Sequence, residues 1–227
     1  MKSKNRIMFG VYGMILAMIG DYLMGFGTTI KSDGPDAILG MAVVVVPDWR
    51  YAVSSVLGFL CVAMYAYAAG EVFRVMEDEY HLSDAKLYNL FKIANWSGIL
   101  YFAFVHIALC MLPVVYNAGM EITGDPSSSM QMVMRVTKSI AVPLIVTYIV
   151  SDLFVTIAWV GMVLKGMIPV RKILFICNPL IIALLGNIMN LIAQGLDSGF
   201  ESFGWLLMYL VCAICLTKGE TRKERAI

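Results

Sequence analysis

Six apolar runs with lengths suited to crossing a lipid bilayer divide the chain of 227 residues. They cover residues 7–27, 51–70, 93–116, 140–164, 173–195 and 203–217. A membrane-spanning helix needs about 20 mostly apolar residues, so only the last run is short. Hydrophobic residues make up 60% of the chain, against roughly 45–50% in soluble domains. The sequence therefore predicts an all-α fold, a polytopic transmembrane bundle of six helices that forms a single domain over residues 1–227.

Positive charges predict how this bundle is oriented, because cytoplasmic loops of membrane proteins are enriched in Lys and Arg. With the N-terminus in the cytoplasm, 13 of the 17 lysines and arginines fall in inner segments. The outer ones are Lys31, Arg50, Arg135 and Lys138. Because six is an even number of spans, the N- and C-termini are both expected to be cytoplasmic.

A shorter apolar stretch, residues 37–46, lies in the first outer loop. Ten residues are too few to cross a bilayer, and this length suits a short re-entrant or interfacial segment. Two interpretations stay open. The stretch is either an interfacial anchor or a lid over an outward-facing cavity.

The first apolar run carries a carboxylate, Asp21, directly after Gly20. A charged side chain near the centre of a membrane helix costs roughly 2.5–3.5 kcal/mol on insertion scales. Small residues precede Asp21 at steps of three or four, at Gly10, Gly13 and Ala17. Because small residues let membrane helices approach closely, we expect Asp21 to face protein and not lipid.

Two further ionisable residues lie near the middle of predicted spans: His106 in the third run and Asp152 in the fourth. Counted by the rise per residue, Asp21, His106 and Asp152 fall within about 6 Å of their helix midpoints. Ionisable residues inside a membrane are functional candidates by default. We therefore expect these three side chains to meet in one polar cavity that opens to the outer side.

Other polar residues lie on the outer side of the predicted bundle and complete the candidate substrate-binding set. They are Arg50, Asn187, Asn190 and Gln194. Arg50 could contact lipid phosphate or turn toward a carboxylate such as Asp21. The polar line in the fifth run could make interhelical hydrogen bonds or line a wet cavity.

Three classes of function fit this pattern. The first is binding or transport of a small polar or cationic solute, because buried carboxylates attract cations. The second is an intramembrane enzyme acting on a lipid or lipid-linked substrate, with Asp21, His106 and Asp152 as candidate catalytic acids and bases, or with Ser54 or Ser151 as a nucleophile beside His106. The third is a non-catalytic sensor or complex subunit, in which the polar groups only hold helices together.

No cofactor is required by the sequence. The chain has two histidines, His81 and His106, on opposite sides of the predicted bundle, which excludes a His-rich zinc centre and a bis-His haem. If a metal is held, its ligands would be Asp21, His106 and Asp152, with water in an open position. The net charge of +1 gives no reason to expect nucleic acid. Membrane lipids and a small-molecule or lipid ligand are the expected partners, and a homo-oligomer or larger membrane complex stays open.

The positions of Gly20-Asp21 late in the first span, Arg50 at the start of the second and His106 in the third carry a resemblance. On these residues the first half of the chain resembles an uncharacterised family of small bacterial six-helix membrane proteins. The resemblance implies an integral protein of the bacterial cytoplasmic membrane and groups Asp21, Arg50 and His106. It implies no activity.

Overall fold

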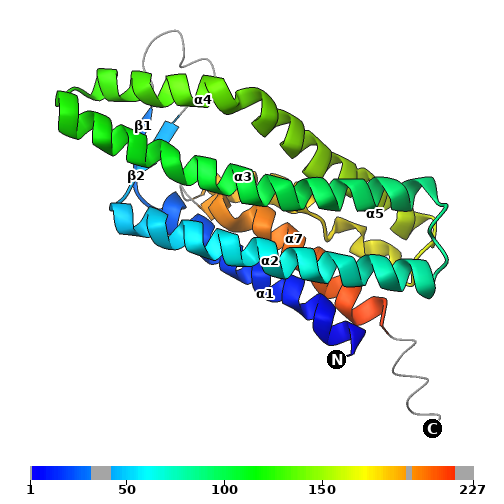
Figure 1. The fold of residues 1–227 in the computed structure, drawn as a ribbon. Coiled ribbons are helices and arrows are strands. Elements are labelled where there is room, and N and C mark those ends of the chain that lie inside the picture. The colour runs from blue at the N-terminus through cyan, green and yellow to red at the C-terminus, as the bar shows by residue number, and fades with distance from the viewer. Residues whose placement is uncertain (1, 32–41, 193–195, 218–227) are drawn as a thin grey trace.

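The structure is a computed structural model that describes residues 2–31, 42–192 and 196–217, and it is predominantly helical (Figure 1). Its elements in chain order are α1 (Ser3–Gly25), the strands β1 (Thr28–Lys31) and β2 (Ala42–Val45), α2 (Asp48–Asp78), α3 (Lys86–Thr123), α4 (Pro126–Tyr148), the π-helical turn η2 (Ile149–Leu153), α5 (Phe154–Leu164), the 3-10 turn η3 (Lys172–Ile176), α6 (Pro179–Asn190), the 3-10 turn η4 (Leu196–Gly199) and α7 (Phe200–Cys215).

Four helical stretches are long and apolar enough to cross a membrane. They are α1, α2, α3 and the continuous helix Pro126–Leu164, which α4, η2 and α5 form together. The helices α6 and α7 are apolar but have only 12 and 16 residues. At 1.5 Å per residue they rise about 18 and 24 Å, less than the roughly 30 Å of a bilayer core. Among the described residues, four of the six predicted spans are therefore both long enough and apolar enough to cross a membrane.

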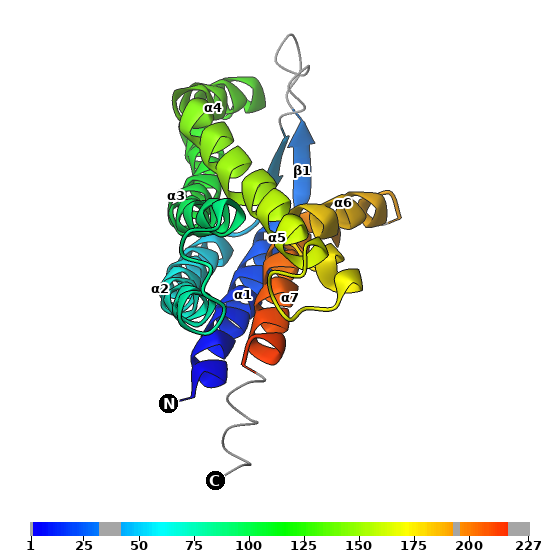
Figure 2. The same cartoon turned by 90° about the vertical axis from the view of Figure 1, so that its right-hand side faces the viewer.

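The stripe of small residues on α1 is buried, as predicted. A Cβ atom on Gly13 would lie 3.1 Å from the backbone oxygen of Cys61, and one on Gly20 would lie 3.1 Å from Ser54 Oγ. Both neighbours belong to α2, so α1 and α2 approach at a distance that side chains larger than hydrogen would prevent. Beside α2, α1 also packs against α7 (Figures 1 and 2).

The fifth apolar run, residues 173–195, is not one helix, which corrects the predicted span. Its first part is the 3-10 turn η3, and α6 begins only at Pro179. Asn178 caps α6, because its side chain accepts a hydrogen bond from the Ile181 amide at 3.1 Å. Proline is favoured in the first helical turn, where its missing N–H leaves no gap. Helix α6 therefore begins several residues into the apolar run, and it projects from the bundle beside α7 (Figure 2).

The described part of the predicted segment 37–46 is a β-strand, and residues 37–41 lie outside the described residues. Strand β2 pairs antiparallel with β1, with Thr28 opposite Val45. Tyr51 at the start of α2 holds this hairpin, because its hydroxyl donates to the Val44 carbonyl at 2.6 Å and accepts from the Val46 amide at 2.9 Å. The described part of this segment is therefore one strand of a β-hairpin that Tyr51 holds against the start of α2.

At the end of the molecule that holds the hairpin, α3 and α4 run side by side as an antiparallel pair (Figure 1). At about 57 Å, estimated from 38 residues, α3 is longer than a bilayer core is thick. A second, smaller apolar cluster lies between these helices, made of Leu112, Tyr116, Met130, Val133 and Met134. The hairpin packs on it through Ile30 and Val45, so this end of the molecule has its own core.

The first turns of α1 and the last turn of α7 lie at the opposite end, beside the α2–α3 connection (Figure 1). Arg6 on α1 donates to Glu71 on α2 at 3.3 Å, and the Tyr80 hydroxyl donates to the Leu216 carbonyl at 2.9 Å. The start of α1 and the end of α7 therefore lie at the same end of the bundle.

Candidate functional site

Asp21 lies on the last turns of α1, where the buried small-residue stripe brings α1 against its neighbours. Its carboxyl oxygen Oδ1 is 3.5 Å from His106 Nδ1 on α3. The other oxygen, Oδ2, accepts a hydrogen bond from the Ser202 hydroxyl on α7 at 2.6 Å. The Asp21 side chain is 18% exposed, so it has polar partners but is not fully buried. Helices α1, α3 and α7 therefore converge on this carboxylate.

The second nitrogen of His106, Nε2, faces Ser54 on α2. It lies 2.9 Å from the Ser54 carbonyl oxygen and 3.0 Å from Ser54 Oγ. The Ser54 hydroxyl donates its own proton to the Gly20 carbonyl at 2.9 Å. Nε2 therefore faces two acceptors and must carry a proton. With Nδ1 directed at Asp21, the geometry fits a positively charged imidazolium paired with the Asp21 carboxylate.

Close contact with α2 fixes the His106 ring. A Cβ atom on Gly58 would lie only 2.3 Å from His106 Cδ2 and 2.8 Å from Nε2. Glycine at this position is what leaves room for the imidazole. Ser54 and Gly58 lie one helical turn apart on α2, so one face of this helix both accommodates and orients the ring.

Asp152 lies in the π-helical turn η2 and is 1% exposed. Its Oδ1 accepts a hydrogen bond from the Trp205 indole at 3.2 Å. Its Oδ2 has no hydrogen-bond partner among the described residues, and the carboxyl group of Glu201 on α7 is close enough to interact with it electrostatically. Two neighbouring carboxyl groups repel each other when both are ionised. Single π-turns inside α-helices are frequent at functional sites.

A polar cavity of about 120 Å³ lies between these groups. Its lining residues are Asp21, Tyr101, Phe102, Val105, His106, Leu109, Ser198, Glu201 and Ser202. Glu201 links the two acidic groups, because it lines the cavity and also contacts Asp152 behind it. The structure therefore joins Asp21, His106, Glu201 and Asp152 into one polar chain across α1, α3, α7 and η2.

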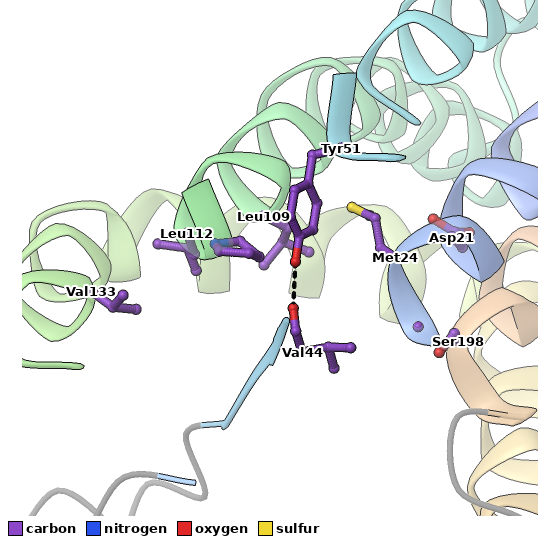
Figure 3. Close-up of a pocket in the computed structure, with 10 residues that line it drawn as sticks. Asp21, Met24, Val44, Tyr51, Leu109, Leu112, Val133 and Ser198 are labelled. Atoms are coloured by element: carbon purple, nitrogen blue, oxygen red, sulfur yellow. Dashed lines mark hydrogen bonds between the residues drawn. The ribbon is translucent and has the colours of Figure 1, made fainter. Parts of the chain in front are cut away.

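A larger cavity of about 250 Å³ adjoins the polar one and shares Asp21, Leu109 and Ser198 with it (Figure 3). Figure 3 shows Asp21 and Ser198 on one side and Val133 of α4 on the other, with Tyr51 and its hydrogen bond to Val44 between them. The rest of the lining is mostly apolar, and Val44 brings the β-hairpin into the wall. The hairpin thus borders the larger cavity on the side of the apolar cluster that lies between α3 and α4.

The structure separates the predicted site residues into two sets. Asp21 and His106 meet in the predicted way, whereas Asp152 lies behind Glu201 and does not line their cavity. Arg50 instead donates to the carbonyls of Phe26 at 2.8 Å and Tyr22 at 3.4 Å. It therefore binds the C-terminal end of α1, where cations are favoured.

The polar residues of the fifth run lie away from this cavity. Asn187 is exposed on α6, Asn190 ends that helix, and neither lines the polar cavity. Gln194 lies outside the described residues. The short and displaced α6 is the physical reason, because it does not run along the bundle as a full span would.

Glu201, Ser202 and Tyr101 belong to the site but were missed by the sequence analysis. Glu201 and Ser202 directly precede the sixth apolar run, so they lie outside the predicted spans. They occupy the first turn of α7, which starts at Phe200. The spacing of four between Glu201 and Trp205 was the available signal, since it places both on one helical face.

The candidate metal ligands do not come together. Within residues 2–31, 42–192 and 196–217, no three His, Cys, Asp or Glu side chains are grouped so that they could hold a metal ion. The candidate nucleophiles are also engaged in the structure. Ser54 is fully buried and donates to Gly20, and the Ser151 hydroxyl donates to the Tyr148 carbonyl at 3.2 Å.

Comparison with known proteins adds one match. No curated protein matches the chain, and no solved structure does. Residues 1–219 match a family of unknown function, DUF6796. This match spans every helix that contributes to the polar cavity, so the chain belongs to the DUF6796 family.

Proposed function

We propose that this is an integral membrane protein that binds a small, singly charged cationic solute in the polar cavity. One observation carries the proposal: Asp21 and Glu201, from two different helices, line the same cavity, and among the described lining residues the one basic side chain is the His106 imidazole. No Lys or Arg belongs to the described lining. A primary ammonium group is the simplest ligand of this class.

The balance of charge supports a monovalent cation. The described lining of the cavity holds two carboxyl groups, Asp21 and Glu201, and one imidazole, His106, while a third carboxyl group, Asp152, lies behind Glu201. Carboxyl groups therefore outnumber basic side chains among the described residues of the site. In a medium of low dielectric constant an isolated charge is costly, so a single positive charge in the cavity would be favourable.

The cavity volume supports a small ligand group. An apolar cavity of about 150 Å³ admits a molecule of the size of benzene, and the polar cavity here has about 120 Å³. An alkylammonium head group fits this space, whereas a bulky organic cation does not. The hydroxyls of Ser198 and Ser202 add oxygen atoms to the lining that can accept an N–H hydrogen bond.

We further propose that both termini are cytoplasmic, on the strength of the asymmetric Lys and Arg distribution and the common end at which both termini emerge. The larger cavity and the β-hairpin then face the outer side. The resemblance to small bacterial membrane proteins supports the cytoplasmic membrane of a bacterium as the location.

Binding of methylammonium to the protein in lipid nanodiscs tests the function. Wild-type protein is expected to bind it saturably, and Asp21→Asn and Glu201→Gln are each expected to weaken binding at least tenfold. Asp48→Asn is the matched control, because Asp48 is an exposed carboxylate that accepts from Asn117 at 2.7 Å, away from the cavity. No saturable binding by the wild type, or equal binding by Asp21→Asn, would contradict the proposal. Uptake of methylammonium into proteoliposomes then separates transport from binding alone.

A further inference from the structure

An apolar groove of about 280 Å³ lies between α3 and α4. Its walls are Tyr101, Val105 and Leu109 on α3 and Leu144, Ile145 and Tyr148 on α4. The two tyrosine hydroxyls are the only side-chain polar atoms in this lining. The α4 wall falls between Pro143 and the π-helical turn η2, two features that interrupt regular helix packing.

The groove adjoins the polar cavity. Tyr101, Val105 and Leu109 line both, so one face of α3 borders a polar space on one side and an apolar space on the other. Glu201 lines the polar cavity together with Tyr101. A molecule with its polar end beside Glu201 could therefore extend its apolar end along this face of α3.

The outer surface of α4 beside the groove is apolar. Val142 is 71% exposed, Ile145 58% and Val146 53%. In a helix long and apolar enough to cross a membrane, such a surface faces lipid chains. The groove is therefore open to the hydrocarbon region of the bilayer, whereas the larger cavity, which the hairpin borders, is open to water.

We propose that the ligand is an amphiphilic amine that enters sideways from the bilayer between α3 and α4. Its ammonium group occupies the polar cavity beside Asp21 and Glu201, and its hydrocarbon chain lies in the groove. The inference rests on the proposed function, since it assigns a substrate class to the same cationic site. The carboxyl groups of the polar cavity favour a cationic head group. Because the apolar groove adjoins this cavity, the site also favours a ligand with a hydrocarbon chain.

Chain length alone does not test this idea. Longer amines concentrate in the bilayer by about fourfold per methylene, whatever the protein does, and a chain gains little when it moves from lipid into an apolar groove. The groove must therefore be tested by filling it. Leu144→Trp and Ile145→Trp add bulk to the α4 wall, and Val142→Trp is the matched control on the same helix, outside the groove.

The experiment measures saturable binding of methylammonium and n-decylammonium to the protein in nanodiscs, with empty nanodiscs subtracted. Leu144→Trp and Ile145→Trp are expected to weaken decylammonium binding at least fivefold and to leave methylammonium within twofold. Retained methylammonium binding also shows that these variants are folded. Val142→Trp is expected to change neither, and Asp21→Asn to weaken both.

Three outcomes would overturn the inference. If neither tryptophan variant weakens decylammonium binding, the chain does not use the groove, while methylammonium binding leaves the proposed function standing. If both variants weaken both amines equally, no separate chain site exists. If Asp21→Asn binds decylammonium as the wild type does, decylammonium is held by apolar contacts alone. Failure of the wild type to bind either amine would instead remove the proposed function itself.

Discussion

Acidic residues lie in two regions of this molecule, and their surroundings differ. At the end where α1 begins and α7 ends, two carboxylates have cationic partners. Glu71, which is 6% exposed, accepts from Arg74 at 2.7 Å and from Arg6 at 3.3 Å. Glu77 accepts from Lys92 at 2.8 Å. In the polar cavity Asp21 and Glu201 have one imidazole between them, and Asp152 lies behind Glu201.

The difference shows that burial of a carboxylate is not by itself a sign of function. Glu71 is as buried as His106, yet its two arginines satisfy it and leave no charge for a ligand. The acidic groups of the cavity have no such partners among the described residues and border an open volume. Unbalanced charge beside a cavity distinguishes a binding site from a structural ion pair.

The largest expected effect is on ligand binding by Glu201→Gln. Removing one of the two cavity carboxylates should weaken methylammonium binding by about 30-fold or more, since losing one partner of a buried charge pair costs about 2–5 kcal/mol. The thermal stability of the empty protein should not fall, because the substitution relieves repulsion between Glu201 and Asp152. Calorimetry and a thermal unfolding scan of the same preparation measure both. A loss of stability with unchanged binding would place Glu201 with the structural carboxylates.

A second expected effect concerns the space for the His106 ring. Gly58→Ala should lower the free energy of unfolding by about 1–3 kcal/mol, the usual cost of overpacking, because the new Cβ would overlap the imidazole. Gly70→Ala is the control on the same helix, with no atom within 4 Å of its added Cβ. It should be neutral or slightly stabilising. Equal stability of the two variants in chemical denaturation would show that the ring is not held by α2.

The same substitution in the other region should have the opposite consequence. Glu71→Gln should lower the free energy of unfolding by about 1–2 kcal/mol, below the 3–5 kcal/mol of a fully buried pair because Arg74 and Arg6 are partly exposed. Methylammonium affinity should stay within twofold of wild type. A change in affinity as large as that of Glu201→Gln would remove the distinction between the two regions.

The smallest expected effect is local and depends on pH. Asp125 caps α4, and hydrogen bonds from the Ser128 hydroxyl and from the Ser128 and Ser127 amides hold its pKa below the ordinary value. A carboxyl with a lowered folded-state pKa stabilises above its unfolded pKa, and this contribution is lost as the pH falls below about 4. The protection factors of the amides in the first turn of α4, corrected for the intrinsic exchange rate at each pH, should therefore fall at acid pH. Asp125→Ala should show these lower protection factors at neutral pH and no further change on acidification.

Much of the fold could be predicted from the sequence, because long apolar runs and small-residue spacing are local signals. The helices around Asp21, His106 and Asp152 occur where predicted, and the buried face of α1 is the predicted one. The hairpin could not be predicted, since the pairing of β1 with β2 joins segments across a loop. The shortened α6 was only partly predictable, because hydropathy does not show where a helix ends.

The candidate site was predictable where charge lies inside an apolar run and unpredictable where it lies at the edge of one. Asp21 and His106 are conspicuous against their neighbours, and the structure brings them within 3.5 Å. Glu201 stands just before an apolar run, so only the tertiary packing of α7 against α1 carries it into the bundle. Arg50 was assigned to the site from its charge, but the free carbonyls at the end of α1 bind it.

The most direct test of the account is a solid-state NMR measurement of where the ammonium nitrogen binds. The protein is reconstituted in bilayers with ¹⁵N-methylammonium and with ¹³C-labelled aspartate and glutamate. The account predicts dipolar contacts from the bound nitrogen to the carboxyl carbons of both Asp21 and Glu201, which vanish in Asp21→Asn. Contacts to Glu71 or to other carboxylates outside the cavity, with none to Asp21 and Glu201, would contradict it.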